Sequence, residues 1–491
     1  MLISSCVFLW HGLAAILEPV AAGEWKAAAA LAAEHGINVT LPRATVKSVP
    51  EMENFMAHPF FRPFLDAEKS NELDGLRDFY EVIRPCLPRT AEAADSGHSA
   101  DLFGALEALD SSLPGLMRKT AGKNSVGEKL LSAIDQTRIP WHDLATAAGR
   151  PSSQLPPVGS TAPEDDYTAP ENTLKTPHGI VEFLLIANLR TLAAIEAGKP
   201  ETARESLLIQ MRIADSFRAT PYLLHAILGN AFHGLILNQL RTGMAQRFWQ
   251  PADLDWIAGW LSRFDGSAEL KAAFESEINF ELSSITFTER NPGAADRQYA
   301  AMAEILGAEN TGNILAPFSQ KWLCFLRGRT EPLYRLAPPA VFQWWCACTV
   351  STSCKKQLSP LKKNGLLGLA FPDEPDESVP DFFSQEKLTL SFLKNEARIR
   401  LFLTARVLHE WHAIHQNFPE TLASLHSFRI DAVQTDPFST QPLIYHRLSS
   451  TACRLYSVGA DLQDDGGSLM QDDEEGDICW HLQAMSAGGG K

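Results

Sequence analysis

The sequence lacks the short motifs that assign a chain to a common enzyme class. It contains no G-x-S-x-G elbow, no Walker phosphate-binding loop and no G-x-G-x-x-G dinucleotide fingerprint. Each of these motifs supplies backbone geometry that serine hydrolysis, nucleotide binding or dinucleotide binding requires. Their absence gives no support to these three functions and directs attention to architecture and ion sites.

Cysteine is also scarce, with eight residues among 491. That is too few for a disulfide scaffold, and no C-x-x-C pair has histidine partners at zinc-site spacing. Cys346, Cys348 and Cys354 lie within nine positions, but without a fourth soft ligand a disulfide or plain thiols are favoured over a metal. The even total fits one or two bridges and buried thiols equally well. The cysteines are at positions 6, 86, 324, 346, 348, 354, 453 and 479.

Basic residues are in deficit, with 43 Lys and Arg against 59 Asp and Glu and a formal net charge of −16. Eight of the acids fall between Asp461 and Asp477, a segment without Lys or Arg. A protein that binds the phosphate backbone needs a basic face. The charge balance therefore predicts that nucleic acid is not a partner.

The N-terminal segment lacks the features of a complete membrane anchor. Residues 2–22 are apolar over about the length of a membrane span, but they include His11, Glu18 and Pro19 and follow no basic residue. Two interpretations stay open: an amphipathic or buried first helix, and a weak anchor that associates the protein with a membrane.

The clearest pattern present is helical and extends from Gly179 to Phe264. Apolar residues recur at helical spacing in GIVEFLLIANLRTLAAIEAG, TARESLLIQMRIADSFRA, YLLHAILGNAFHGLILNQLRTG and ADLDWIAGWLSRF. We expect this region to be the stability core. Because AAIEAGKPETA resembles a tetratricopeptide-type helix pair but no period is sustained, the pattern predicts layered helical hairpins rather than a regular solenoid. Leucines expected to be buried are Leu185, Leu189, Leu208, Leu224 and Leu228.

Proline and glycine breaks divide the rest of the chain. A helix over residues 24–35 is expected to stop at Gly36, and the proline-rich arm after it contains Asn54, which we expect to hydrogen-bond the backbone. The predicted organisation is an N-terminal helical region with an extended arm (1–148), a linker (149–170), an α-helical body (171–370), an acidic linker (371–395), an α+β module (396–482) and a tail (483–491).

The module begins with the helical run EARIRLFLTARVLHEWHAIHQNFPETLASL. Short-strand patterns follow in TDPFSTQPLIYHRLSSTACRLYSVGADLQDDGG and DICWHL. This order of helix, proline-led turn, Asp-Pro segment, strand ending in Tyr-Ser-Val-Gly, and Asp/Gly loop resembles the C-terminal half of the type II secretion major pseudopilin. It is more similar to large envelope proteins of planctomycete and verrucomicrobial type. The resemblance implies a small α+β module and a periplasmic or membrane-anchored location facing the periplasm, with the cytoplasm as the alternative, and it implies no biochemical activity.

The acidic loop after the Tyr-Ser-Val-Gly segment is the most informative site. Ca²⁺ takes several hard oxygen ligands and tolerates irregular geometry. Gly466 and Gly467 allow the loop to fold tightly, and the pseudopilin module that it resembles binds calcium at the corresponding loop. A solvated acidic loop without a bound ion is the alternative. The predicted calcium ligands are Asp461, Asp464, Asp465, Asp473 and Asp477, with Asp472 able to replace one of the last two.

The histidines of HEWHAIH are the other candidate metal ligands. Zinc metallopeptidases place two histidines four residues apart, whereas His409, His412 and His415 are three apart and drift around the helix. We therefore expect them to be catalytically silent.

The resulting expectation is a mainly α protein with a helical-hairpin body and a pseudopilin-like module. Its expected function is a non-enzymatic structural or interaction role in the bacterial cell envelope, with envelope proteins as partners. A metal-dependent hydrolase that uses the helix from His409 to His415 with acidic partners is the alternative.

Overall fold

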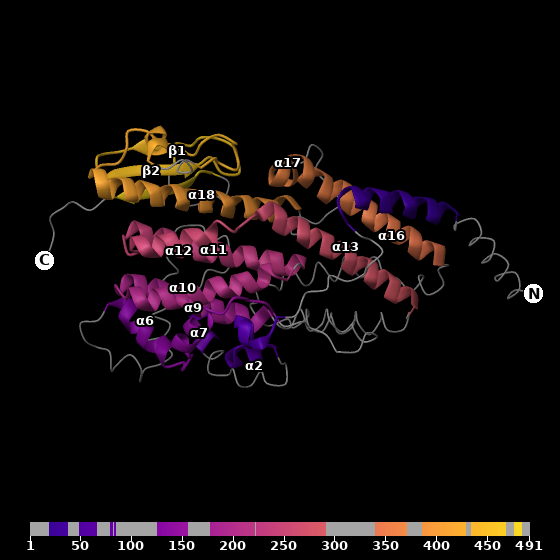
Figure 1. The fold of residues 1–491 in the computed structure, drawn as a ribbon, viewed down its shortest axis with the longest axis horizontal. Coiled ribbons are helices and arrows are strands. Elements are labelled where there is room, and N and C mark those ends of the chain that lie inside the picture. Colours follow the sequence, from indigo (N-terminus) through magenta and orange to yellow (C-terminus); the bar gives the residue numbers. More distant parts are fainter. Residues whose placement is uncertain are drawn as a thin grey trace, which may run out of the picture.

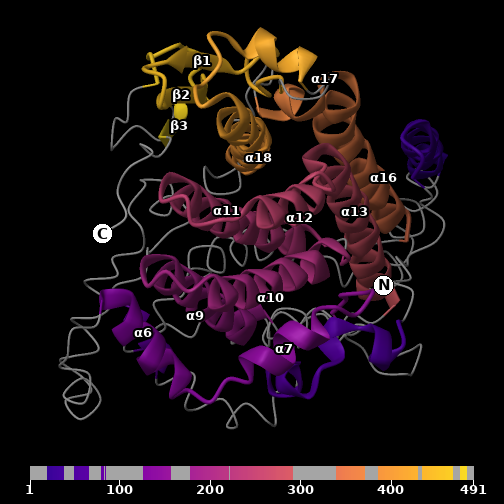
Figure 2. The same ribbon diagram turned by 60° about the vertical axis from the view of Figure 1, so that its left-hand side comes forward.

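The protein is mainly helical, with a small three-stranded antiparallel sheet near its C-terminal end (Figure 1). The computed structural model describes residues 19–37, 49–65, 79–81, 83–84, 125–155, 177–220, 222–290, 339–370, 385–428, 434–467 and 476–483. Within these residues the elements form successive layers, with a helical arm that extends to one side (Figures 1 and 2).

Four consecutive helices form the centre of the body, and their bounds agree with the helical pattern expected from Gly179 to Phe264. Pro200 and Pro251 occupy first turns, where a missing N–H breaks no helical hydrogen bond. Gly198, with φ of +67°, makes the turn that ends the first helix of the set. The helices are α9 (Pro177–Glu196), α10 (Pro200–Arg218), α11 (Leu223–Ala245) and α12 (Pro251–Leu261).

The core of this body contains most of the leucines expected there. Leu185, Leu189 and Leu228 are buried, as predicted. Leu208 and Leu224 are only half-buried against the same core, because neighbouring side chains of α10 and α11 occupy the innermost positions. Those innermost residues include Leu207, Ile209, Phe232 and Ile236.

Helices α6 (Val126–Asp135) and α7 (Trp141–Ala147) cover the outer side of α9 and α10 (Figure 2). Beside them lie the 3₁₀ turns η1 (Glu51–Glu53), η2 (Phe55–Ala57) and η3 (Pro59–Phe61), and the short helix α2 (Arg62–Leu65). The side chain of Asn54 donates to the carbonyl of Gln154 (2.8 Å) and accepts from its N–H (2.9 Å). The expected backbone role of Asn54 is thereby confirmed, and its side chain fastens the proline-rich segment around it to residues 152–154.

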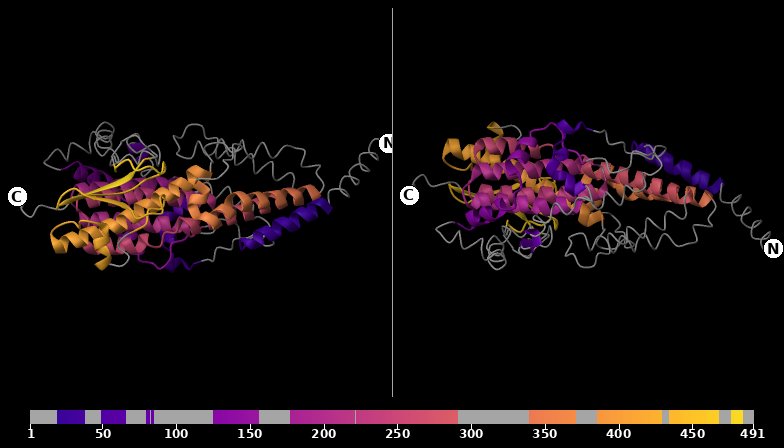
Figure 3. Two further views of the ribbon diagram at one scale, coloured as in Figure 1. Left: turned by 90° about the horizontal axis from the view of Figure 1, so that it is seen from above. Right: turned by 90° about the horizontal axis from the view of Figure 1, so that it is seen from below.

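The arm is built from helices that the chain contributes at widely separated points (Figure 3). Helix α13 (Gly266–Arg290) leads into it, and α16 (Pro339–Ser353), the π turn η9 (Cys354–Leu358) and α17 (Ser359–Ala370) return along it. A further helix over residues 19–34 packs on this group and stops just before Gly36, whose φ is +78°. A second hydrophobic cluster, including Phe274 and Val350, holds the arm together.

Helix α18 (Gln385–His415) lies on α11 and α12 and carries the sheet on its other side (Figure 1). It begins at Gln385 and not at Glu396, so the end of the segment expected to be an acidic linker is helical. The reason is that Phe392 and Leu393 are buried in the cluster of the arm. The 3₁₀ helix η11 (Leu422–Ser427) and the strands β1 (Ile444–Arg447), β2 (Ala452–Ser457) and β3 (Ile478–Gln483) follow, in the order β1-β2-β3.

The sheet and the body share one hydrophobic core. Trp480 of β3 meets Phe402 of α18 edge to face, with ring centroids 6.2 Å apart, and both rings belong to the cluster that contains α9, α10 and α11. Arg247, just past α11, donates from Nε to the carbonyl of Gln483 (2.5 Å). The sheet that carries the acidic loop therefore packs on the larger of the two hydrophobic clusters of the described residues.

The cysteines and the hydropathy of the helices bear on the two remaining expectations, a disulfide and a membrane anchor. Cys348, Cys354, Cys453 and Cys479 are free thiols, and positions 6, 86 and 324 lie outside the described ranges. None of the helices described combines the length and hydropathy that a membrane span requires. Most of the apolar N-terminal segment, residues 2–18, lies outside these ranges.

Candidate ion site on the C-terminal sheet

The Asp-Pro turn before β1 positions the end of β2. Asp436 is almost completely buried, and its carboxylate accepts hydrogen bonds from the Ser457 hydroxyl (2.7 Å) and the Val458 N–H (3.1 Å). It also accepts from the Phe438 N–H (3.0 Å). A buried carboxylate is stable only when such donors replace water. The turn and the strand end therefore form one rigid unit, from which the acidic loop emerges.

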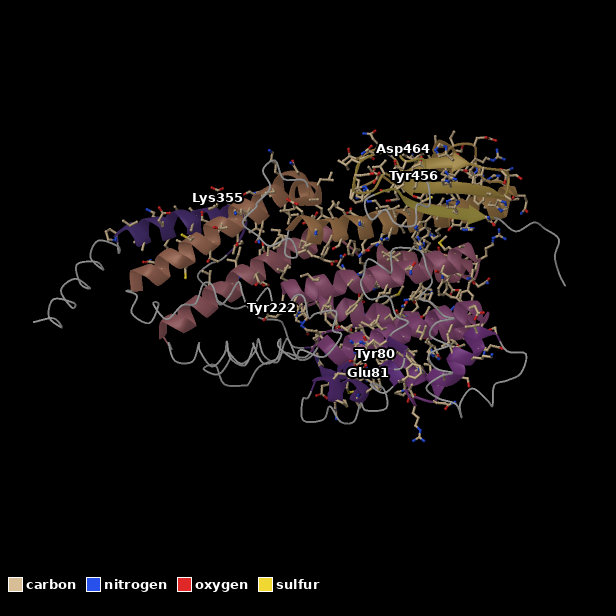
Figure 4. All side chains as sticks on the ribbon, turned by 180° about the vertical axis from the view of Figure 1, so that it is seen from behind. Tyr80, Glu81, Tyr222, Lys355, Tyr456 and Asp464 are labelled. Atoms are coloured by element: carbon tan, nitrogen blue, oxygen red, sulfur yellow. The ribbon has the colours of Figure 1, made fainter. Side chains whose placement is uncertain are left out.

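The loop is fastened to the sheet through Tyr456, which lies beside Asp464 in Figure 4. The Tyr456 hydroxyl donates to Oδ1 of Asp464 (2.9 Å), which also accepts from the Gly466 N–H (2.9 Å). Nε2 of His446 lies 3.1 Å from the same hydroxyl. Burial and the Asp464 carboxylate both raise the pKa of Tyr456, which stays a protonated donor.

Gly467 closes the loop against β2. Its φ of +65° is in the left-handed region, and a Cβ atom there would lie 2.6 Å from Arg454 Cδ and 2.7 Å from Tyr456 Cδ1. Only glycine permits both the conformation and the approach. Its N–H then donates to Oδ2 of Asp477 (2.6 Å), just before β3, so the two acidic segments are joined across the loop.

Asp477 is the residue of this loop with spare coordinating capacity. Its Oδ1 is buried and accepts no hydrogen bond from the described residues. Burial raises the pKa of Asp477, and the carboxylates of Asp464 and Asp465 raise it further, against the lowering effect of the backbone N–H groups of Gly467 and Asp465. Electrostatic repulsion thus links these three acids, and one of them, Asp477, has a buried oxygen without a hydrogen-bond partner among the described residues.

The predicted ligands are brought together only in part. Asp464, Asp465 and Asp477 interact, whereas Asp461 points its Oδ1 to the Gln463 N–H (3.0 Å) in a local turn. Asp473 and its alternate Asp472 lie outside the described residues. Among the residues that are described, no three His, Cys, Asp or Glu side chains gather closely enough to hold a metal ion on their own.

The histidines near the end of α18 are in a different environment. Burial lowers the pKa of His409 to about 4, with a further contribution from Arg247, and burial also lowers the pKa of His412. The rings of both pack on Phe418, while His415 packs on Trp411, with centroids 4.1 Å apart. Nε2 of His409 and of His412 has no hydrogen-bond partner in the described part of the chain. The prediction that these histidines are catalytically silent stays a prediction.

Sequence reasoning missed the residues that organise the loop. Asp436, His446 and Tyr456 carry its hydrogen bonds, but their spacing along the chain follows strand pairing and not any local motif. The Tyr-Ser-Val-Gly ending was the available signal, because it contains both Tyr456 and the Ser457 hydroxyl that Asp436 binds. No protein-family model, curated protein or solved structure matches this chain.

Proposed function

We propose that the chain is a non-enzymatic structural or interaction component of the bacterial cell envelope, with a pseudopilin-like C-terminal unit whose acidic loop binds Ca²⁺. The observation that carries the ion proposal is the buried Oδ1 of Asp477, which has no hydrogen-bond partner among the described residues, in a carboxylate that Asp464 and Asp465 repel. A divalent cation would give this oxygen a partner and remove the repulsion among the carboxylates.

Calcium suits the loop better than smaller cations do. It accepts about six to eight oxygens, including backbone carbonyls and waters, so two or three carboxylates suffice with help from the loop backbone. Mg²⁺ demands a strict octahedron and dehydrates reluctantly. Gly466 and Gly467, at φ of +76° and +65°, fold the loop so that their N–H groups donate to Asp464 and Asp477, while the Gly466 carbonyl accepts from Arg454 (2.5 Å).

The compartment decides whether such a site would be filled. Calcium sites of extracellular modules work at about 10⁻⁴–10⁻³ M. An affinity in this range would match a calcium-rich compartment and a periplasmic location.

The scaffold role is supported by the use of polar groups in the body. Buried side chains there join helices to one another: Gln210 of α10 donates to Thr191 of α9 (2.9 Å) and to Gln239 of α11 (3.2 Å). The consecutive antiparallel hairpins of α9, α10 and α11 resemble tetratricopeptide-type pairs, which commonly present surfaces to protein partners. We infer envelope proteins as the partners.

Thermal melting of the full-length protein tests the calcium proposal. After chelator treatment, millimolar Ca²⁺ should raise the melting temperature more than equal Mg²⁺, since an ion that binds only the folded state stabilises it by about 2.7 kcal/mol at a hundredfold excess over its dissociation constant. Asp464→Asn combined with Asp477→Asn should abolish the difference between the two ions.

The matched control is Asp143→Asn, an exposed acid of α7 on the opposite side of the molecule (Figure 1), which should leave the calcium response unchanged. A wild-type melting curve that ignores calcium would refute the ion site. Cell fractionation tests the location separately, and recovery of the protein only with cytoplasmic markers would contradict the envelope role.

A further inference from the structure

A cavity of about 470 Å³ lies away from the sheet, at the base of the arm. The end of the 19–34 helix, the first turns of α13, and η9 with α17 form its walls. Sites for small molecules usually have volumes of about 300–1,000 Å³ and combine apolar walls with a few polar groups. This cavity has the required size, and its lining is mostly polar, with Leu358 and Leu361 as its large apolar side chains.

The wall contributed by η9 and α17 is irregular on both sides of the cavity residues. The π turn Cys354–Leu358 ends at the first of them, Leu358, and Gly365 (φ +61°, ψ −149°) interrupts α17 after the last. Leu358, Leu361 and Lys362 come from this interval and line the cavity. Because such distortions cost energy, they occur mostly where a helix must present particular side chains.

Two ammonium groups from different helices reach the cavity. Lys362 donates to the carbonyl of Glu34 at the end of the 19–34 helix (2.8 Å), and Lys271 of α13 lies 3.3 Å from Glu275. Burial lowers the pKa of His35, and Lys362 and Lys271 lower it further, whereas the carboxylates of Glu34 and Glu275 raise it. Each ammonium has three N–H donors, so one contact leaves others for a ligand.

Acids stand beside both lysines of the cavity: Glu275 pairs with Lys271, and Glu34 and Asp265 belong to the lining. The Asp265 carboxylate accepts from the Ala268 N–H (2.9 Å) and caps α13, and Glu34 is exposed to solvent. The apolar part of the lining is provided by Leu358 and Leu361. The cavity therefore offers cationic donors beside a leucine surface.

We propose that this cavity binds an organic anion with a short aliphatic tail, its carboxylate between Lys271 and Lys362 and its tail on Leu358 and Leu361. The ammonium groups supply charge-assisted hydrogen bonds, and the leucines supply apolar contact that a purely inorganic anion cannot use. Because Lys362 also holds the end of the 19–34 helix, the bound anion would connect that helix to α13.

Isothermal titration of the full-length protein with sodium octanoate tests the proposal. Wild type should bind saturably, whereas acetate, which lacks the tail, and 1-octanol, which lacks the charge, should bind at least about tenfold more weakly. Lys271→Met combined with Lys362→Met should weaken octanoate binding by about a hundredfold, since each lost ion pair is worth about one factor of ten. The two single variants should each lose part of the affinity.

Lys355→Met is the matched control, because Lys355 is an exposed lysine of the same π turn that does not line the cavity (Figure 4). It should bind octanoate as wild type does, and Lys271→Arg with Lys362→Arg should retain binding. Melting curves of every variant verify folding. Absence of saturable octanoate binding to wild type, or equal binding by the double methionine variant, would overturn the proposal.

Discussion

At the scale of single residues, buried polar side chains take the place of backbone pairing. Asn54 satisfies both backbone groups of Gln154 as a neighbouring strand would, and the Asp436 carboxylate accepts from the Ser457 hydroxyl and the Val458 N–H at the end of β2. Each of these two side chains joins separate segments of the chain. Removing one should therefore lower the free energy of unfolding by more than the contribution of a single hydrogen bond. Glycine is also important at this scale, because two segments can approach closely where the residue between them has no side chain.

We predict that Gly127→Ala destabilises the protein. A Cβ at Gly127 would lie far inside contact distance of the Ala193 carbonyl and the Glu196 carboxylate, so α6 would have to move away from α9. Overpacking of this kind typically costs about 1–3 kcal/mol. Urea denaturation measures the loss.

Gly259→Ala in α12 is the control, since a Cβ there would meet nothing within 4 Å. Alanine in an exposed helix should stabilise the protein by about 0.5–1 kcal/mol. Equal effects of the two changes would show that the close approach of α6 and α9 is not what matters.

At the scale of elements, a buried amide pair fixes the position of α18 on α11. Asn395 donates to the carbonyl of Asn230 (2.7 Å) and to its Oδ1 (2.8 Å), and Asn230 donates to the Ser391 hydroxyl (2.9 Å). Hydrophobic contacts alone would tolerate sliding of one helix along the other, but these directional bonds favour one register.

Asn395→Ala should therefore cost about 2–3 kcal/mol of unfolding free energy, because buried acceptors of Asn230 lose their donor. Adding Asn230→Ala should cost less than the sum of the two single changes, since the second removes a group that the first left unpaired. Chemical denaturation of the four proteins in this cycle gives the coupling energy. Additive losses would mean that the pair does not act as a unit.

At the scale of the whole molecule, neutral histidines buried in the body make stability depend on pH. His225 and His233 are almost completely buried, and burial lowers their pKa values to about 4 and about 3. Above about pH 6.5 the unfolded chain is also neutral at these positions, and they make no pH-dependent contribution. As pH falls below 6.5 only the unfolded chain takes up protons, so stability is lost until the folded pKa values are reached.

His225→Phe should remove the part of this pH-dependent loss of stability that His225 causes. Its Nδ1 has no hydrogen-bond partner among the described residues, and phenylalanine can keep the ring contacts with Phe217 and Tyr222. Between pH 7 and pH 5 wild type should lose about 2 kcal/mol more than the variant. Parallel urea titrations at the two pH values measure the difference, and identical pH profiles would contradict a neutral buried His225.

The local pattern of the sequence determined the elements. Periodic leucines and terminal prolines are properties of neighbouring residues, and they were sufficient to predict α9 to α12 and the strand that ends before Gly459. The same local patterns indicated that Asn54 serves the backbone. They could not place the beginning of α18, because the residues from Gln385 onward are helical through burial of Phe392 against another part of the chain.

Only the tertiary structure decided which residues meet. Asp461 and Asp464 stand three positions apart, yet one turns to its own backbone and the other is held by Tyr456. The cavity at the base of the arm unites Lys271 with Lys362, and no local pattern relates them. Such sites depend on the packing of segments distant in the chain, and the free energy of that packing comes from shared apolar surface rather than from the sequence around each site.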